Sequence, residues 1–359
     1  MPRPAVIFGG VSPEHDISIL TGLQAARALG DPHCLYWSKT GDWYEVDGGL
    51  EGRDFADGVP RKARPLHLVT GPGGGFMTDL KKGRRLDISA AVVCCHGAPG
   101  EDGTLQGALD LAGLAYTGPD AAAAALGMDK LAFGAVASGA GLPVLPRVAV
   151  IPEDGWAPTF AGPYIVKPRF GGSSIGIAVA ADAGAVVALS RQSVHLRKGA
   201  VVEPYRPDSA DLEIAVRSYP GIELSAISLP ETKGVYSYEQ KYVGGEGMTS
   251  APRRMNPVLP GSTANVVREV AATVAVITRL RGVARVDFLL DGEDVYLNEV
   301  NTIPGSLSWH LWVDPPVPFA TLLEGLLEEA ARRPTTQWTT AGADGTALRS
   351  AGDINNKLG

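Results

Sequence analysis

"GVARVDFLLDGEDVYLNEVN", residues 282–301, has an informative pattern of apolar and charged residues. It reads as a strand, a turn and a second strand, in which side chains alternate between the two faces. Arg285 and Asp287 then share one face of the first strand, and Glu299 and Asn301 share one face of the second. If the strands pair as a hairpin, these faces coincide and gather two carboxylates, an amide oxygen and a guanidinium in one cluster.

This cluster has two interpretations. Hard oxygen ligands of this kind suit Mg²⁺ that bridges nucleotide phosphates. The alternative is a surface ion pair between Arg285 and Asp287, with Glu299 simply exposed to solvent. The residues of the cluster alone do not separate the two.

A second stretch, "KPRFGGSSIG" at residues 167–176, predicts a strand and a Gly-Ser loop, and the sequence after it predicts a return strand. The loop glycines allow the backbone to approach phosphate oxygens and donate N–H groups to them. No GxxxxGK[ST] loop is present, and by itself a Gly-Gly-Ser-Ser run is more typical of a tight turn. Lys130, in "GMDKLAFG", would by itself be a solvated helix residue.

Two apolar runs, "AVIF" and "ISAAVVCC", predict strands buried on both faces of a parallel sheet. The loops that follow them, "GGVSPEHDIS" and "HGAPGEDGTLQG", lie where open α/β sheets bind ligands. Helical spacing predicts one helix that contains residues 266–277, capped by Ser262 or Thr263, and another near residues 322–332. From Thr335 onward the composition predicts a mobile tail.

Composition narrows the class of protein. The chain has 359 residues, 45% hydrophobic and 20% charged, which is typical of a soluble globular protein with two or three domains. Its net charge of -7 argues against a nucleic-acid or membrane partner. Three cysteines, two of them adjacent, indicate reduced core residues. No signal peptide or membrane span is recognisable, so a cytoplasmic protein is expected.

Seven ordered stretches carry a family resemblance: "GGVSPEHDISI", "HGAPGEDGTLQG", "MDKL", "KPRFGGSSIG", "SYEQKY", "ARVDFLL" and "NEVNTIPG". In order and spacing the chain resembles the D-alanine–D-alanine ligases of the ATP-grasp superfamily, from about residue 4 to about residue 333. The resemblance implies an α/β protein with an N-terminal parallel α/β domain followed by a two-lobed ATP-grasp unit. The expected divisions are residues 1–120, 121–212 with the Gly-Ser loop, 213–334 with a lid and the metal site, and a tail at 335–359.

The resemblance implies an ADP-forming ligase that joins two amino acids. The γ-phosphate of ATP would pass to a carboxylate, giving an acyl phosphate that a second amino acid attacks through its amine. ATP, two Mg²⁺ ions or Mn²⁺ in their place, amino-acid substrates and a homodimer are expected. The motifs do not fix the oligomeric state, the stereochemistry of the substrates or the identity of the acceptor.

The resemblance also assigns roles to individual residues. Catalysis falls to Glu14, Ser173, Tyr242, Arg285 and Gly305; ATP binding to Lys130, Lys167, Glu203, Tyr205, Glu213 and Lys241; substrate binding to His96, His310 and Leu311; metal binding to Asp287, Glu299 and Asn301. The stretch at residues 203–205 would contact adenine through its backbone, and Glu213 would bind the ribose. Tyr242, on the lid at residues 237–257, would complete a hydrogen-bonded triad with Ser173 and Glu14.

The chain departs from the family pattern near the acceptor pocket. Ser306 replaces a large apolar residue, and His310 stands where Ser is usual for the acceptor carboxylate. Gly171 and Ser237 stand at positions where members of the family often have acidic residues. Three hypotheses follow: a cell-wall D-Ala–D-Ala ligase, a related ligase with another donor or acceptor, and a nucleotide-binding protein without turnover. A charged His310 would strengthen the grip on a carboxylate, whereas a His310 packed between Trp309 and Trp312 would be structural.

Overall fold

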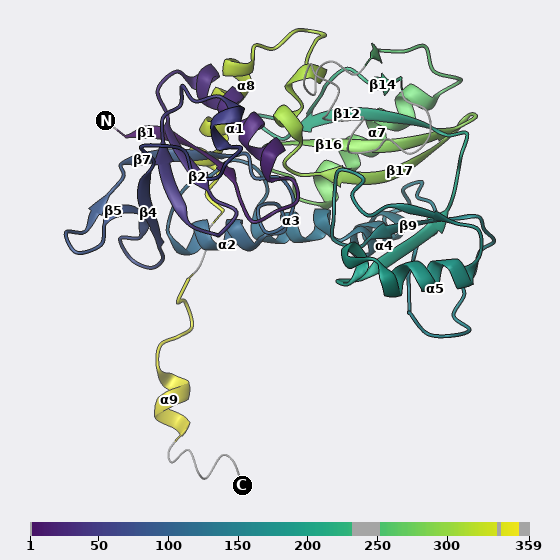
Figure 1. Ribbon diagram of the computed structural model, residues 1–359, viewed down its shortest axis with the longest axis horizontal. Coiled ribbons are helices and arrows are strands. Elements are labelled where there is room, and N and C mark those ends of the chain that lie inside the picture. The colour runs from purple at the N-terminus through teal and green to yellow at the C-terminus, as the bar shows by residue number, and fades with distance from the viewer. Residues whose placement is uncertain (1, 232–251, 336–338, 352–359) are drawn as a thin grey trace.

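The computed structural model describes residues 2–231, 252–335 and 339–351. Three sheets follow one another through this part of the chain. Three hydrophobic cores accompany them, and the first core also includes Ala215 and Val283 of the third sheet. In Figure 1 the first sheet lies on the left, the second at the lower right and the third at the upper right. This order agrees with an N-terminal α/β unit followed by two further lobes, while the domain boundaries themselves remain predictions.

The first sheet has strand order β6-β5-β4-β3-β2-β1-β7. β1 pairs in parallel with β2 and β7, and the apolar residues of β1 are fully buried, so the two predicted strands are confirmed as parallel neighbours. Antiparallel strands extend this parallel part on one side. These strands were not predicted from the sequence, because they are short and lack a clear alternation of apolar and polar residues. The elements of this unit are β1 (Arg3–Gly9), α1 (His15–Leu29), β2 (His33–Trp37), β3 (Trp43–Val46), a 3-10 helix η1 (Gly52–Phe55), β4 (Arg64–Val69), β5 (Gly75–Asp79), β6 (Arg84–Arg85), β7 (Ile88–Val93) and α2 (Thr104–Leu111).

The second sheet is antiparallel, with order β10-β9-β11-β8. The loop between β9 and β10 is the Gly-Ser loop, so the predicted strand, loop and return strand are confirmed. Helix α5 packs against β9 and β10. The elements are α3 (Ala121–Met128), α4 (Lys130–Gly139), β8 (Val148–Ala149), β9 (Tyr164–Pro168), β10 (Ala178–Ala180), α5 (Ala183–Gln192), η2 (Val194–Leu196) and β11 (Ala200–Pro204).

The third sheet has order β15-β14-β12-β16-β17, with β13 paired to β12. Helix α7 covers it, beginning after Ser262 as predicted, although the Ser262 side chain makes no capping hydrogen bond. The elements are β12 (Ala210–Arg217), β13 (Glu223–Leu224), β14 (Ser228–Pro230), β15 (Arg253–Met255), α7 (Thr263–Ile277), β16 (Val283–Asp291), β17 (Asp294–Asn301), η3 (Gly305–Leu311), α8 (Phe319–Arg332) and α9 (Thr346–Ala351).

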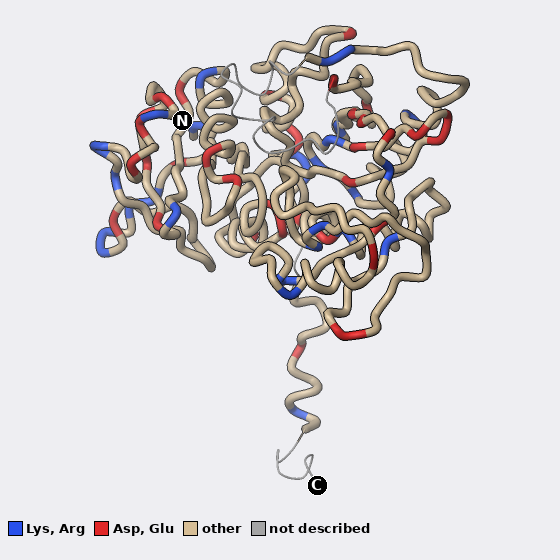
Figure 2. Tube along the Cα trace, turned by 45° about the vertical axis from the view of Figure 1, so that its right-hand side comes forward, with Lys and Arg blue, Asp and Glu red and all other residues tan. Residues whose placement is uncertain are grey.

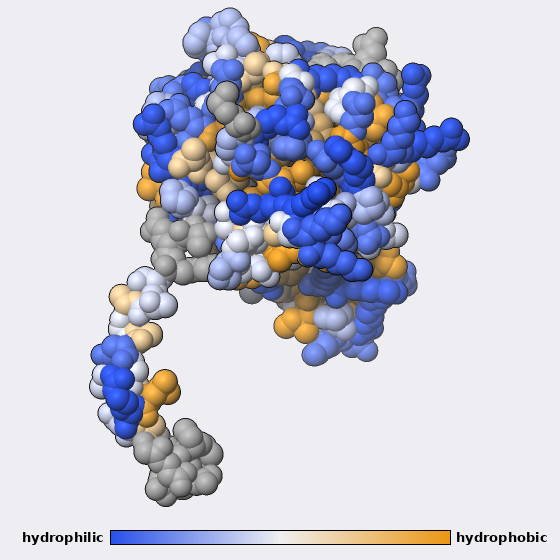
Figure 3. Space-filling view, turned by 90° about the vertical axis from the view of Figure 1, so that its left-hand side faces the viewer, coloured by the Kyte–Doolittle hydropathy of each residue, from blue (hydrophilic) through white to orange (hydrophobic). Residues whose placement is uncertain are grey.

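The last long helix returns to the first unit. α8 begins three residues before the predicted start and packs against α1 and β7 (Figure 1). The short helix α9 stands away from the body, and the face seen in Figure 3 is mainly hydrophilic. The three cysteines are buried and free, as predicted. Among the described helices, none has the length and apolar character that crossing a membrane requires.

Candidate active site

The hairpin of β16 and β17 forms with the predicted faces together. Arg285 lies opposite Asn301, and Asp287 lies opposite Glu299. Asp287 accepts hydrogen bonds from Arg285 Nε at 2.6 Å and from Asn301 Nδ2 at 2.9 Å. Arg285 therefore does pair with Asp287, as the surface hypothesis held, but the pair is part of a larger, half-buried cluster rather than a solvated surface contact.

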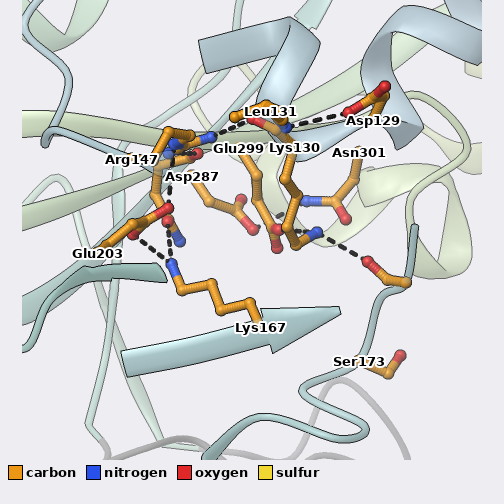
Figure 4. A network of polar contacts seen from close by, with 12 residues as sticks. Asp129, Lys130, Leu131, Arg147, Lys167, Ser173, Glu203, Asp287, Glu299 and Asn301 are labelled. Carbon is orange, nitrogen blue, oxygen red and sulfur yellow. Dashed lines mark hydrogen bonds and ion pairs between the residues drawn. The ribbon is translucent and has the colours of Figure 1, made fainter. Parts of the chain in front are cut away.

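Two lysines approach the hairpin from the second unit. Lys130 begins helix α4, and its Nζ lies 2.7 Å from Glu299 Oε2 and donates to the carbonyl oxygen of Gly171 at 2.7 Å. Lys167, on β9, donates to Glu203 Oε2 at 2.7 Å and to Asn298 Oδ1 at 3.0 Å. Both lysines are buried, so neither is a solvated surface residue (Figure 4). Figure 2 shows basic and acidic residues together in the middle of the molecule.

The Gly-Ser loop reaches across to the first unit. Ser173 donates a hydrogen bond to the carboxylate of Glu14, which lies at the N-terminus of α1. Gly172 lies so near that an added Cβ would be 3.0 Å from Glu14 Oε2. Ser173 has φ 51°, in the left-handed region, which turns the loop toward Glu14. Two members of the predicted triad are thus in contact; the third, Tyr242, lies outside the described residues, as does Lys241.

Two adjoining pockets lie around these residues. The larger is lined by both lysines, by the backbone region of β11 that contains Glu203 and Tyr205, and by Asp287 and Glu299. The smaller contains Glu14, His96, Arg285, Asn301, Gly305 and His310 in its lining. Arg285, Glu213 and Glu299 line both pockets, so a group transferred from one pocket to the other would pass this cluster.

Known proteins resemble the chain over most of its length. The family model "D-ala D-ala ligase N-terminus" matches residues 3–119, and "D-ala D-ala ligase C-terminus" matches residues 137–328. A D-alanine–D-alanine ligase of a Bradyrhizobium species is 30% identical over 354 residues, covering 92% of this chain and 95% of that protein. One from Kocuria rhizophila is 33% identical over 376 residues, covering 93% and 95%.

The chain belongs to the D-alanine–D-alanine ligase family. It is accordingly an ATP-dependent ligase of the ATP-grasp fold, in a family that uses a divalent metal ion. Among solved structures, the ligase of Coxiella burnetii has a TM-score of 0.74 at 24% identity and covers 93% of this chain and 96% of its own. The VanG D-Ala:D-Ser ligase of Enterococcus faecalis has a TM-score of 0.72 at 22% identity, covering 92% and 99%. These two structures support the fold, and the two ligases differ by name in the second amino acid, D-alanine in one and D-serine in the other.

For a family member, the carboxylates of the hairpin fit a divalent cation. Burial raises the pKa of Asp287; Arg285 opposes this shift, and the neighbouring Glu213 and Glu299 add to it. A cation would relieve the repulsion between these carboxylates. Among the described residues no three acidic, histidine or cysteine side chains already converge on one point. A cation held there would therefore take few protein ligands and complete its shell with phosphate oxygens, as Mg²⁺ usually does.

The expected ribose contact of Glu213 stays a prediction. Glu213 lines both pockets, and its carboxylate lies 3.2 Å from Arg253 Nη1 and 3.6 Å from Arg285 Nε. Asp211, two residues earlier and on the same face of β12, also lines the larger pocket. Asp211 was not predicted from the sequence, although the period of two along β12 could have offered it.

His310 lines the smaller pocket and is uncharged at neutral pH. Burial, reinforced by the positive charge of Arg253, lowers its pKa to about 4. The alternative of a charged His310 is therefore disfavoured. The two tryptophans have other ring partners, since Trp309 stacks on Phe319 and Trp312 lies against Arg217, so these contacts give no support to the packing of His310 between them. Neither ring nitrogen of His310 has a hydrogen-bond partner among the described residues.

The other residues expected near the substrates are buried or hydrogen-bonded within the protein. The side chain of Leu311 is fully buried in the first core, so only its backbone could reach an acceptor. Ser306 is also buried, and its hydroxyl donates to Gln24 of α1 at 2.7 Å. His96 lines the smaller pocket, but its Nδ1 contacts the oxygen of Ile303 at 2.7 Å and its Nε2 contacts Thr21 Oγ1 at 2.8 Å. These contacts make His96 a ring fixed in place.

Sequence reasoning missed three charged residues of the site. Glu101 accepts the backbone N–H of Ile303 at 2.8 Å, and burial raises its pKa to about 7, with Glu14 adding to the shift. Arg253 lines the smaller pocket beside His310. Arg147 lies beneath the lysines. Glu101 stands inside a quoted motif and Arg253 inside the predicted lid at residues 237–257, so both could have been found, whereas no local pattern marks Arg147.

Proposed function

We propose that the chain joins D-alanine or a close analogue to a second amino acid, forming a dipeptide with ADP and phosphate as the other products. The observation that carries this proposal is the junction of the two pockets. A nucleotide-sized pocket with two buried lysines meets an amino-acid-sized pocket with a carboxylate, Glu14, at a cluster of Arg285, Asp287, Glu299 and Asn301.

The first step is the transfer of the γ-phosphate of ATP to the carboxylate of the first substrate. The residues of the site support this step by their position and charge. Lys130 and Lys167 offset the charge of the phosphates, which would otherwise repel the incoming carboxylate. We propose that adenine lies against the backbone at residues 203–205 and that ribose contacts Glu213, with Asp211 as a second candidate. A divalent cation, held by Asp287, Glu299 and Asn301, would supply charge neutralisation for the transferring phosphoryl group. We propose two Mg²⁺ ions, for which Mn²⁺ can substitute.

The second step takes place in the smaller pocket. Glu14 would hold the ammonium of the first substrate, and Ser173 keeps the Glu14 carboxylate in place. The deprotonated amine of the acceptor would attack the carbonyl carbon of the acyl phosphate, while Arg285 and the N–H of Gly305 stabilise the oxyanion. The bond to phosphate then breaks, phosphate leaves, and the nitrogen gives up a proton as the peptide bond forms. His96 and Glu101 fix the loop that contains Ile303, directly before the Pro-Gly turn. The lid residues Lys241 and Tyr242 would exclude water, because an acyl phosphate hydrolyses readily.

A ligase with a non-standard acceptor is a second candidate. The observation that favours it is His310, a neutral ring that occupies part of the smaller pocket where the family commonly has Ser.

We also propose a homodimer, on the resemblance alone, and a cytoplasmic reaction, because ATP is a substrate. Light scattering after size exclusion tests the dimer.

Incubation with ATP, Mg²⁺ and a panel of single and paired D- and L-amino acids tests the proposal. We expect phosphate release that depends on an added amino acid, together with a dipeptide of matching mass. The variant Glu299→Gln should lose about a hundredfold or more of this activity, since one of the cation's charged ligands is removed. Phosphate release without any dipeptide would refute ligation and indicate ATP hydrolysis alone. No phosphate release with any pair would refute ligation and favour a nucleotide-binding protein without turnover.

A further inference from the structure

Arg147 connects three elements beneath the nucleotide pocket. Its Nη1 donates to the carbonyl oxygen of Lys130 at 2.8 Å, and its Nη2 donates to that of Asn298 at 2.9 Å. Its Nε lies 3.0 Å from Glu203 Oε1. Only 5% of the Arg147 side chain is exposed, and Arg147 is not among the residues that line the larger pocket. Figure 4 shows the guanidinium behind Glu203, on the side away from Lys167.

The carboxylate of Glu203 creates an electrostatic problem for phosphate binding. It is almost completely buried and lies directly against Lys167. Burial alone would raise the pKa of Glu203, but Lys167 and Arg147 outweigh burial and lower it, so the carboxylate stays ionised. The pair of Lys167 and Glu203 is then neutral and would present little net charge to phosphate oxygens.

Arg147 supplies the missing charge. With Lys167, Glu203 and Arg147 together, the cluster has two positive groups and one negative group, and Lys167 is the positive group that faces the pocket. The same guanidinium fixes the backbone of Lys130, the other lysine, and of Asn298, whose side chain contacts Lys167. One residue outside the pocket therefore acts on both lysines within it.

We propose that Arg147 is a positioning residue for the nucleotide phosphates, which offsets the Glu203 carboxylate so that the charge of Lys167 remains available to ATP. This inference rests on the proposed function, because it requires that the larger pocket binds ATP. It goes further by giving the phosphate affinity a source outside the pocket. If Arg147 had only a structural role, its substitution would impair folding, but the loss of ligand affinity would not depend on the number of phosphates in the ligand.

Nucleotide affinity of Arg147 variants tests the inference. For Arg147→Gln we expect the dissociation constant of ATP to rise about tenfold or more, because a positive charge near the phosphates is lost. The inhibition constant of adenosine, measured in competition with ATP, should change less than about twofold, because adenosine has no phosphate charge. Arg147→Lys keeps the charge and should recover most of the loss.

The double variant Arg147→Gln with Glu203→Gln gives the sharpest test. Removal of both charges leaves Lys167 as an unopposed cation, so ATP affinity should return to within about threefold of the parent protein. Arg191→Gln is the matched control, since Arg191 pairs with the exposed Asp154 in the same unit. This control should bind ATP as the parent protein does.

Several results would overturn the inference. They are unchanged ATP affinity in Arg147→Gln, an equal loss for ATP and adenosine, or a double variant no better than Arg147→Gln. If thermal melts show that Arg147→Gln does not fold, Arg147→Lys and the double variant decide the question alone, and both must bind ATP. Failure of the parent protein to bind ATP would instead refute the proposed function, which keeps the two failures distinct.

Discussion

His310 shows how burial overrides what a residue type suggests. An imidazole in a pocket that binds carboxylates suggests a charged role, yet desolvation, reinforced by the positive charge of Arg253, lowers its pKa to about 4. A neutral ring can still donate one hydrogen bond and accept another. The acceptor would therefore meet a polar but uncharged group at this position.

Acid stability follows from the same shift. The unfolded histidine has a pKa near 6.5 and the folded one about 4, so the unfolded state binds the proton first. The stability linked to His310 is complete above pH 6.5 and is lost as pH falls toward 4, by up to about 3 kcal/mol. His310→Asn should flatten the fall of unfolding free energy in this window. Urea unfolding of both proteins at a series of pH values measures the difference.

Two other buried groups also titrate in this experiment, and the direction of each group's effect on stability follows from its pKa shift. His96 behaves like His310, since burial also lowers its pKa to about 4. Glu101 acts in the opposite direction, because its raised pKa of about 7 means that stability is lost as pH rises through that value. Both remain in the variant and cancel in the comparison. Parallel pH curves for the two proteins would contradict the shift assigned to His310.

At the scale of elements, the sequence predicted what local periodicity determines. The hairpin of β16 and β17 was predicted because alternation fixes which faces meet, and the contact of Glu14 with Ser173 because both lie in family motifs. Strands β3 to β6 were not predicted, since they are short and lack a clear pattern. Arg147 was missed because its importance depends on three partners distant in sequence, which no local pattern reveals.

Helix α1 gives a prediction at this scale. It packs on β1 through Gly22, where an added Cβ would lie 2.4 Å from the Cβ of Phe8. Gly22→Ala should cost about 1–3 kcal/mol of stability through overpacking. Because Glu14 stands at the start of α1 and Thr21 contacts His96, the KM for the first amino acid should rise more than that for ATP.

A glycine in α8 provides the control for this change. Gly325 has no atom within 4 Å of its added Cβ. Gly325→Ala should therefore be neutral or stabilising by about 0.5–1 kcal/mol, with both KM values unchanged. Thermal melts and initial rates of the two variants are compared. Equal effects of the two substitutions would show that the close approach of α1 to β1 is not what positions the amino-acid pocket.

At the scale of the whole molecule, the site exists only where three units meet. Glu14 and His96 come from the first unit, Lys130 and Ser173 from the second, and the hairpin from the third. The bond between Ser173 and Glu14 crosses from the second unit to the first. A connection of this kind is suited to control whether the pockets are closed to water during the reaction.

Ser173→Ala tests that connection. Without the hydroxyl, the Gly-Ser loop loses its bond to Glu14, and water should reach the acyl phosphate more often before the acceptor does. We expect the ratio of phosphate released to dipeptide formed to rise clearly above one, while ATP still binds through the two lysines. Ser190→Ala is the matched control in the same unit, because its hydroxyl donates to the carbonyl oxygen of Val187 within α5. Coupled phosphate and product assays give the ratio directly, and a ratio that stays at one in Ser173→Ala would mean that the loop is held closed by other contacts.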